Sequence, residues 1–268
     1  MDELKNDALF QLNWAIEHFK EEKTPSYWDT IHQLLRDHPE LAGMADEMGE
    51  YPLHKAANYG CEFAITRLLE AGAEVDAVTE NDRRETPLHL AAHNGHADAC
   101  RYLADAGADL TRRAADGFTP LLEAIYRHQA EVVGTLLRLG APMDLRVAVN
   151  LRQRAIVGLM LRDNPDLVRV EPDATNLVAE AALCGDIDVL RLLLEAGADP
   201  NTARVSAHSL YNAVFRGDRA AVELLLAYGA DPDREVSPGA TTARQYADQH
   251  AAEEVRAWAL NLFSPPIR

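Results

Sequence analysis

The sequence predicts an all-α fold of stacked helix pairs, and two observations carry this prediction. A short phrase occurs three times, as Tyr51-Pro52-Leu53-His54, Thr86-Pro87-Leu88-His89 and Thr119-Pro120-Leu121-Leu122, with its prolines 35 and 33 residues apart. Each copy is followed by a Leu-Leu or Tyr-Leu pair and then by Gly-Ala. A period of about 33 residues indicates one supersecondary unit that repeats and stacks on its neighbours.

Each copy of the phrase is expected to begin a helix. The hydroxyl of Thr86 or Thr119 can cap a helix N-terminus, and the proline that follows suits the first turn, where its missing N–H has no partner to lose. Gly95 ends this first helix, and Gly107 ends the second one in the same way, because glycine readily adopts a positive φ. The repeating unit is therefore two antiparallel helices.

The repeats continue in the part of the chain where the opening phrase can no longer be recognised. The segments Gly185–Asp199 and Gly217–Asp231 share one pattern at a spacing of 32 residues. Between them and the third copy, Asp144–Arg152 and 155–161 supply a weaker helix pair. Only Gly140–Met143 joins this pair to the preceding unit, so we expect a shortened connection there.

The two ends differ from the middle, because a terminal repeat needs a polar outer face. We expect an N-terminal capping helix pair in residues 1–48, repeats in 49–236, and a C-terminal capping repeat and tail in 237–268, all within one continuous solenoid domain. Trp14, Trp28 and Trp258 lie in the end pieces and are expected to seal the ends of the core.

Composition excludes several function classes. The chain has 26 Lys and Arg against 43 Asp and Glu, a net charge of −17, which argues against direct binding to nucleic acid or to an anionic membrane. Neither an apolar run of about 20 residues nor a secretory leader is recognisable. We therefore expect a cytoplasmic protein in which Cys61, Cys100 and Cys184 are reduced, packed thiols.

From about Tyr51 to Leu260 the chain resembles the ankyrin-repeat family, on its Thr-Pro-Leu-His phrases and on the Gly-Ala-Glu/Asp loops that begin at Gly72, Gly107, Gly197 and Gly229. The resemblance implies an all-α ankyrin-repeat solenoid of helix-turn-helix units with short β-hairpin fingers. The finger is expected to be missing at Gly140–Met143. The resemblance also implies a module that binds another protein and carries no catalysis.

Enzymatic and metal-binding interpretations are weaker. His89 and His93 stand four residues apart, a spacing that can serve one metal ion. However, His89 and His54 complete the repeated phrase, and in the family this histidine hydrogen-bonds neighbouring backbone. Phosphate-binding loops and nucleophile elbows are not recognisable in the sequence. We expect no catalytic residue, no cofactor and no metal ligand.

In the family, the fingers and the exposed sides of the first helices line a concave groove. The residues here that correspond to groove positions, and that are of types that anchor interfaces, are Tyr59, Arg84, His93, Phe118, Tyr126, Arg127, Phe215 and Arg216. The leading hypothesis is a scaffold or inhibitor that holds a protein partner in this groove. A basic partner, held by an immunity- or antitoxin-like protein, is one explanation of the acidity, and solubility is the other.

Two alternatives from other classes stay open. The first is a small-molecule or metal sensor that uses Cys184 and histidines as ligands. The second is an architectural repeat protein that homo-oligomerises through its aromatic end pieces.

Overall fold

The computed structural model describes residues 2–19, 25–170, 177–201, 208–235 and 239–263, and within these ranges the chain is helical and contains no strand. The chain divides into two compact units, unit 1 (Met1–Pro142) and unit 2 (Met143–Arg268), which are described separately. The expected single continuous domain stays a prediction. Its expected boundary between residues 236 and 237 lies outside the described ranges.

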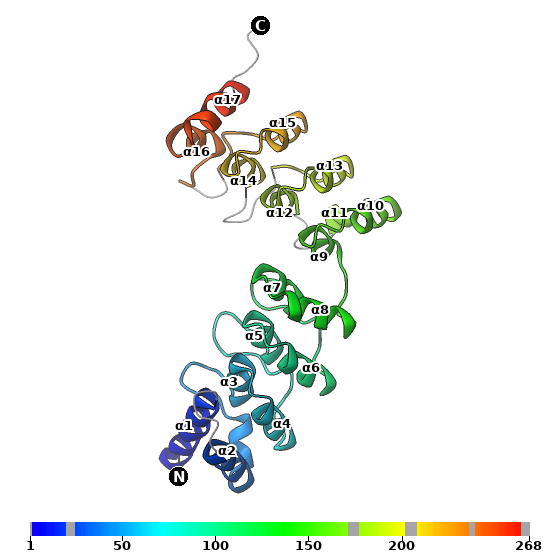
Figure 1. Ribbon diagram of the computed structural model, residues 1–268. Coiled ribbons are helices and arrows are strands. Elements are labelled where there is room, and N and C mark those ends of the chain that lie inside the picture. Colours follow the sequence, from blue (N-terminus) through cyan, green and yellow to red (C-terminus); the bar gives the residue numbers. More distant parts are fainter. Residues whose placement is uncertain (1, 20–24, 171–176, 202–207, 236–238, 264–268) are drawn as a thin grey trace. The chain divides into compact units, whose positions relative to one another are not determined.

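Unit 1 consists of helix pairs that stack side by side (Figure 1). The first helices of its repeats, α3, α5 and α7, pack against one another in one row, and the second helices α4, α6 and α8 form another row. Helix α1 packs on α3 and α2 packs on α4, so these two helices continue the two rows at the N-terminal side. The elements of unit 1 are α1 (Asp2–His18), α2 (Pro25–Asp37), η1 (Pro39–Gly43), α3 (Pro52–Tyr59), α4 (Glu62–Glu70), α5 (Pro87–His93), α6 (Ala97–Asp105), α7 (Pro120–Tyr126) and α8 (Ala130–Arg138).

Unit 2 repeats the same two-row arrangement. Its first helices α9, α12, α14 and α16 pack in sequence, as do the second helices α10, α13, α15 and α17, while the short helix α11 follows α10. The elements of unit 2 are α9 (Leu145–Asn150), α10 (Arg154–Asp163), α11 (Leu167–Val170), α12 (Leu177–Cys184), α13 (Ile187–Glu195), α14 (Ser209–Phe215), α15 (Arg219–Ala227), α16 (Ala243–Gln249) and α17 (Glu253–Phe263).

The helices begin where the capping residues predict. The hydroxyl oxygen of Thr119 accepts a hydrogen bond from the amide of Leu122 at 3.3 Å, and Asp144 accepts one from the amide of Val147 at 2.8 Å. The connection after a first helix passes through a left-handed residue, which is Gly95 (φ 81°) after α5. His128 (φ 58°) occupies this position after α7, so the turn does not depend on glycine in every repeat.

The loops between repeats are short and closed by few backbone hydrogen bonds. In the first finger the amide of Thr79 donates to the carbonyl oxygen of Glu85 at 2.9 Å, and in the second the amide of Ala114 donates to that of Phe118 at 2.9 Å. The pairing is too short to form a β-ladder, so these fingers are tight loops. The connection between α8 and α9 has only six residues, 139–144, whereas sixteen residues, 71–86, join α4 to α5, so the expected shortening of this connection is observed.

The tryptophan prediction is correct for one residue and wrong for two. Trp258 of α17 packs, partly buried, against the core of unit 2. Trp14 and Trp28 are 43% and 50% exposed, because smaller aliphatic side chains, such as Leu12 and Ile31, fill the core between the N-terminal helices. The Trp28 ring stacks instead on Phe63 of α4, with ring centroids 5.0 Å apart.

In the part of the chain that the structure describes, none of the helices is both long enough and apolar enough to cross a bilayer.

Candidate partner-binding surface

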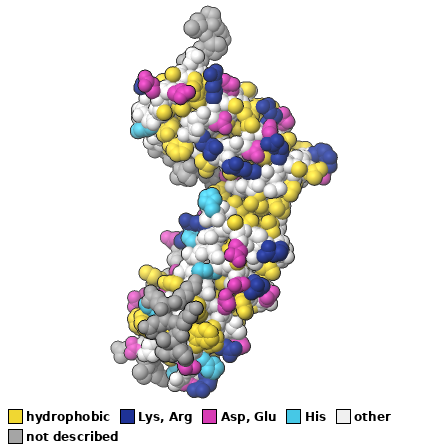
Figure 2. Space-filling view, viewed as in Figure 1, with side chains coloured by type: hydrophobic (Ala, Val, Ile, Leu, Met, Phe, Trp, Pro, Cys, Tyr) yellow, Lys and Arg dark blue, Asp and Glu magenta, His cyan; other side chains and the backbone are white. Residues whose placement is uncertain are grey.

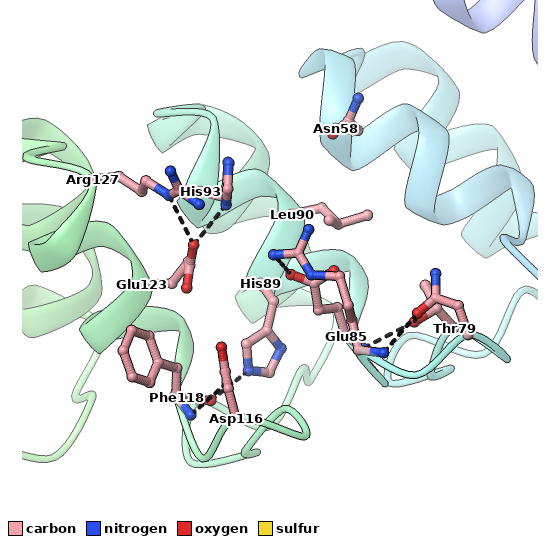
Figure 3. A network of polar contacts seen from close by, with 12 residues as sticks. Asn58, Thr79, Glu85, His89, Leu90, His93, Asp116, Phe118, Glu123 and Arg127 are labelled. Carbon is pink, nitrogen blue, oxygen red and sulfur yellow. Dashed lines mark hydrogen bonds and ion pairs between the residues drawn. The ribbon is translucent and has the colours of Figure 1, made fainter. Parts of the chain in front are cut away.

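A buried carboxylate organises the exposed side of the first helices in unit 1. Glu123 of α7 is only 6% exposed, and its Oε1 lies 2.6 Å from Nδ1 of His93 and 3.1 Å from Nε of Arg127. Figure 3 shows the two side chains converging on this oxygen from neighbouring repeats. Because His93 belongs to α5, the contact joins the two helices and holds the side chains of His93 and Arg127 in defined positions.

An aromatic pair lies beside this network. The rings of Phe118 and Tyr126 are tilted against each other with centroids 4.7 Å apart, a geometry typical of stabilising aromatic pairs. The carbonyl oxygen of Phe118 also lies 3.0 Å from Nε2 of His89 in the preceding repeat (Figure 3). The finger that carries Phe118 is therefore fixed at its base, and both half-buried rings are held in place.

The histidines of the repeated phrase connect each repeat to the loop of the next one through side-chain contacts with the backbone. Nε2 of His54 and of His89 each lies 3.0 Å from a carbonyl oxygen of the next loop, that of Glu85 or Phe118. Burial lowers the pKa of both imidazoles, although their backbone partners oppose this shift. These side chains are therefore neutral at neutral pH. His208 makes the same contact, with the carbonyl oxygen of Arg234.

The same contacts bear on the metal hypothesis. His89 directs its two ring nitrogens to Thr86 and to Phe118, while His93 faces Glu123. Among the described residues there is no group of three or more His, Cys, Asp or Glu side chains that could hold one metal ion.

Unit 2 carries an aromatic cluster on its own first helices. Phe215, at the end of α14, is 59% exposed and lies near Tyr211 and Tyr246, with centroid distances of 6.4 and 5.9 Å. Leu183 is exposed at the equivalent position of α12. The guanidinium of Arg216 packs over Gly185, where an added Cβ would lie 2.5 Å from its nitrogen. The expected pair of Phe215 and Arg216 therefore belongs to a larger surface.

The expected site residues fall into both units. Tyr59 is half-buried at the end of α3, and Arg84 is exposed in the first finger with a left-handed φ of 50°. The structure joins Phe118 to Tyr126 directly, and it joins His93 to Arg127 through Glu123. Phe215 and Arg216 lie in unit 2. That all eight residues line one continuous surface stays a prediction.

Sequence reasoning missed the buried carboxylates. Glu180 in α12 is the counterpart of Glu123, since each lies five residues before the left-handed residue that follows its helix. It is 6% exposed, and it accepts hydrogen bonds from Arg146 Nε at 2.9 Å and from Asn150 Nδ2 at 2.7 Å. His93 and Asn150 hold the same position in the repeat before each glutamate. The shared position of Glu123 and Glu180 in their repeats, each preceded by a polar residue at the same place one repeat earlier, is the sequence pattern that predicts these two buried carboxylates.

The charge of the chain is unevenly divided but locally mixed. Unit 1 has a net charge of −12 and unit 2 of −5, with histidine neutral. On the face that Figure 2 shows, acidic and basic side chains are interspersed.

Comparisons with known proteins agree with the repeat geometry. A family model for ankyrin repeats in three copies matches residues 23–114 and 53–147, and a single-repeat model matches 177–204. An ankyrin repeat-containing protein of Treponema pallidum (strain Nichols) is 34% identical over 131 residues, which are 48% of this chain and 36% of that protein. Cyclin-dependent kinase 4 inhibitor B of Rattus norvegicus is 39% identical over 56 residues, 21% of this chain and 43% of that protein.

A solved structure, the human ASB11 ankyrin repeat domain, matches with 27% identity and a TM-score of 0.47 over 81% of this chain and 100% of that one. The chain spans less than half of the length of the curated relatives named above. The repeated phrases, the helix pairs and the family models agree, and ankyrin repeats indicate a protein–protein interaction module. The chain belongs to the ankyrin-repeat family.

Proposed function

We propose that this chain is a non-catalytic module that binds a protein partner along its first-helix face, meaning the exposed side of the first helices together with the finger loops. The observation that carries the proposal is the buried Glu123, which fixes His93 and Arg127 beside the aromatic pair of Phe118 and Tyr126. Arg127 is nevertheless exposed, and the two rings remain half-exposed.

This arrangement suits partner binding for two physical reasons. Tyrosine, arginine and other large side chains supply most of the binding energy in protein interfaces. In addition, a side chain that is already held in place loses little conformational entropy when a partner binds, which leaves more of the contact energy for affinity. Glu123 and the contact between the two tilted rings supply this preorganisation.

The partner that unit 1 favours is a basic protein. The net charge of −12 in unit 1 would attract such a partner over long distances and raise its association rate. We place the protein in the cytoplasm, where buried thiols such as Cys100 stay reduced. An inhibitory role, such as that of an immunity protein or antitoxin, is one form of this function, and the segment similar to the cyclin-dependent kinase inhibitor supports it.

The test compares capture by matched variants. The immobilised wild-type chain, a Phe118→Ala/Tyr126→Ala variant and a Tyr102→Ala variant are exposed to extract of the source organism. Tyr102 is the control because it is an exposed aromatic residue of unit 1 that lies on a second helix, α6. We expect wild type and Tyr102→Ala to retain the same partner and the double variant to lose it. The proposal would be refuted by a partner that the double variant retains and the Tyr102→Ala variant loses.

A further inference from the structure

The N-terminal cap of unit 1 contains a cavity that the first-helix face does not include. It has a volume of about 520 Å³ and lies between α1 and the loop that follows η1. Three large apolar side chains at this cavity are strongly exposed, namely Phe10 (69%), Trp14 (43%) and Met48 (70%). Single exposed apolar residues are ordinary, but three around one cavity form an apolar patch of the kind that marks a binding site.

A nearly buried asparagine lines the same cavity. Asn13 is 8% exposed, and its Oδ1 is buried without a hydrogen-bond partner among the described residues. Leaving such an oxygen unpaired costs about 1–3 kcal/mol, and native proteins rarely do so. Because this oxygen is shielded in the observed orientation, an N–H donor on an occupant reaches it only when the Asn13 amide turns toward the cavity, and that hydrogen bond would then remove the cost.

The rim of the cavity is acidic. Glu17, Asp46 and Glu47 line it, and Glu47 is exposed. The ammonium group of Lys55 lies 3.8 Å from Glu17, 3.4 Å from Asp46 and 2.7 Å from Glu50, so one cation serves three carboxylates. Negative charge therefore remains in excess beside the apolar side chains. A cationic group on the occupant would complement it.

We propose that this cavity, here called the cap pocket, binds a short peptide segment of a partner protein in which an apolar side chain stands next to a lysine or arginine. The apolar side chain packs between Phe10, Trp14 and Met48. The Asn13 amide turns toward the bound peptide and accepts a hydrogen bond from one of its N–H groups, and the cation lies against the acidic rim. The cap pocket adds a second contact site to the chain, on the N-terminal pair rather than on the first-helix face.

The test uses Trp14 as an internal reporter. A Trp28→Phe/Trp258→Phe chain retains Trp14 as its only tryptophan. Its fluorescence is titrated with acetylated, amidated peptides that carry Leu or Phe beside Lys or Arg, and with the same peptides carrying Glu instead. We expect saturable binding of the cationic peptides, at least about tenfold weaker binding of the acidic ones, and a loss of this difference as salt rises from about 50 to about 500 mM.

Asn13→Leu separates a binding role from a structural one. Leucine fills a similar volume without an unpaired oxygen, so the urea midpoint should stay or rise while peptide affinity falls at least about tenfold. Tyr102→Ala, on α6, should change neither quantity. The proposal is overturned by any of three results: no saturable binding of any cationic peptide up to about 1 mM, unchanged affinity in Asn13→Leu, or a concentration-dependent dimer that Asn13→Leu dissociates.

Discussion

Replacing Leu193 by alanine tests the placement of α13 in the core of unit 2. Leu193 is fully buried, with 0% exposure, within the cluster that also holds Leu190 and Leu210. The substitution removes three buried carbon groups, worth about 2.4 kcal/mol at about 0.8 kcal/mol each. The cavity left behind adds to this cost, so the free energy of unfolding should fall by about 3 to 5 kcal/mol.

Leu192→Ala is the matched control, because the neighbouring Leu192 is only partly buried and packs at the edge of the same cluster. It should cost less than half as much. Both variants are made in a Trp14→Phe/Trp28→Phe chain, in which the remaining Trp258 reports unfolding of unit 2 by fluorescence in urea. Equal urea midpoints for the two variants, or no loss in Leu193→Ala, would refute the placement of the helix.

Three further predictions concern charge and protonation. Glu123→Gln should lower the free energy of unfolding by about 1–3 kcal/mol, because two charge-assisted contacts to a buried acid are weakened, whereas the exposed Glu131→Gln should change little in the same urea assay. The lowered pKa values of His54 and His89 mean that the unfolded chain binds protons that the folded one does not; urea midpoints should therefore fall as the pH drops below 6.5, and a rise would contradict the burial of these rings. Burial raises the pKa of Cys100 to about 12, so iodoacetamide should modify this thiol far more slowly in the native protein than in urea. Equal modification rates, measured by mass spectrometry, would falsify this.

The sequence predicted those features that local chemistry dictates. Thr119 and Pro120 begin a helix because the threonine side chain caps its N-terminus and the proline ring fixes φ at a helical value. Both effects act within a few residues, so they can be predicted from the sequence. The left-handed conformation of His128 could not be predicted in this way, because histidine adopts a positive φ only occasionally and the geometry shared by the repeats, rather than the local sequence, places it there.

The candidate site was less predictable for the same reason. The eight expected residues were chosen by their place in the repeat, yet the position that organises unit 1 is Glu123. A glutamate on a short helix normally indicates a solvated face, and its burial arises only when α5 brings His93 against α7. Trp14 shows the opposite case, because a residue expected in the core is displaced by Leu12 and Ile16, which fill that space.

Photo-cross-linking tests most directly whether the first-helix face binds the partner. A photoreactive amino acid replaces Arg127 in one chain and Arg101 in another. Both positions are exposed in unit 1, and Arg127 directly follows the first helix α7 whereas Arg101 lies on the second-row helix α6. After irradiation in extract of the source organism, a covalent adduct with a discrete partner polypeptide should form from position 127 and not from position 101. An adduct that forms from position 101 alone would contradict the proposed binding surface.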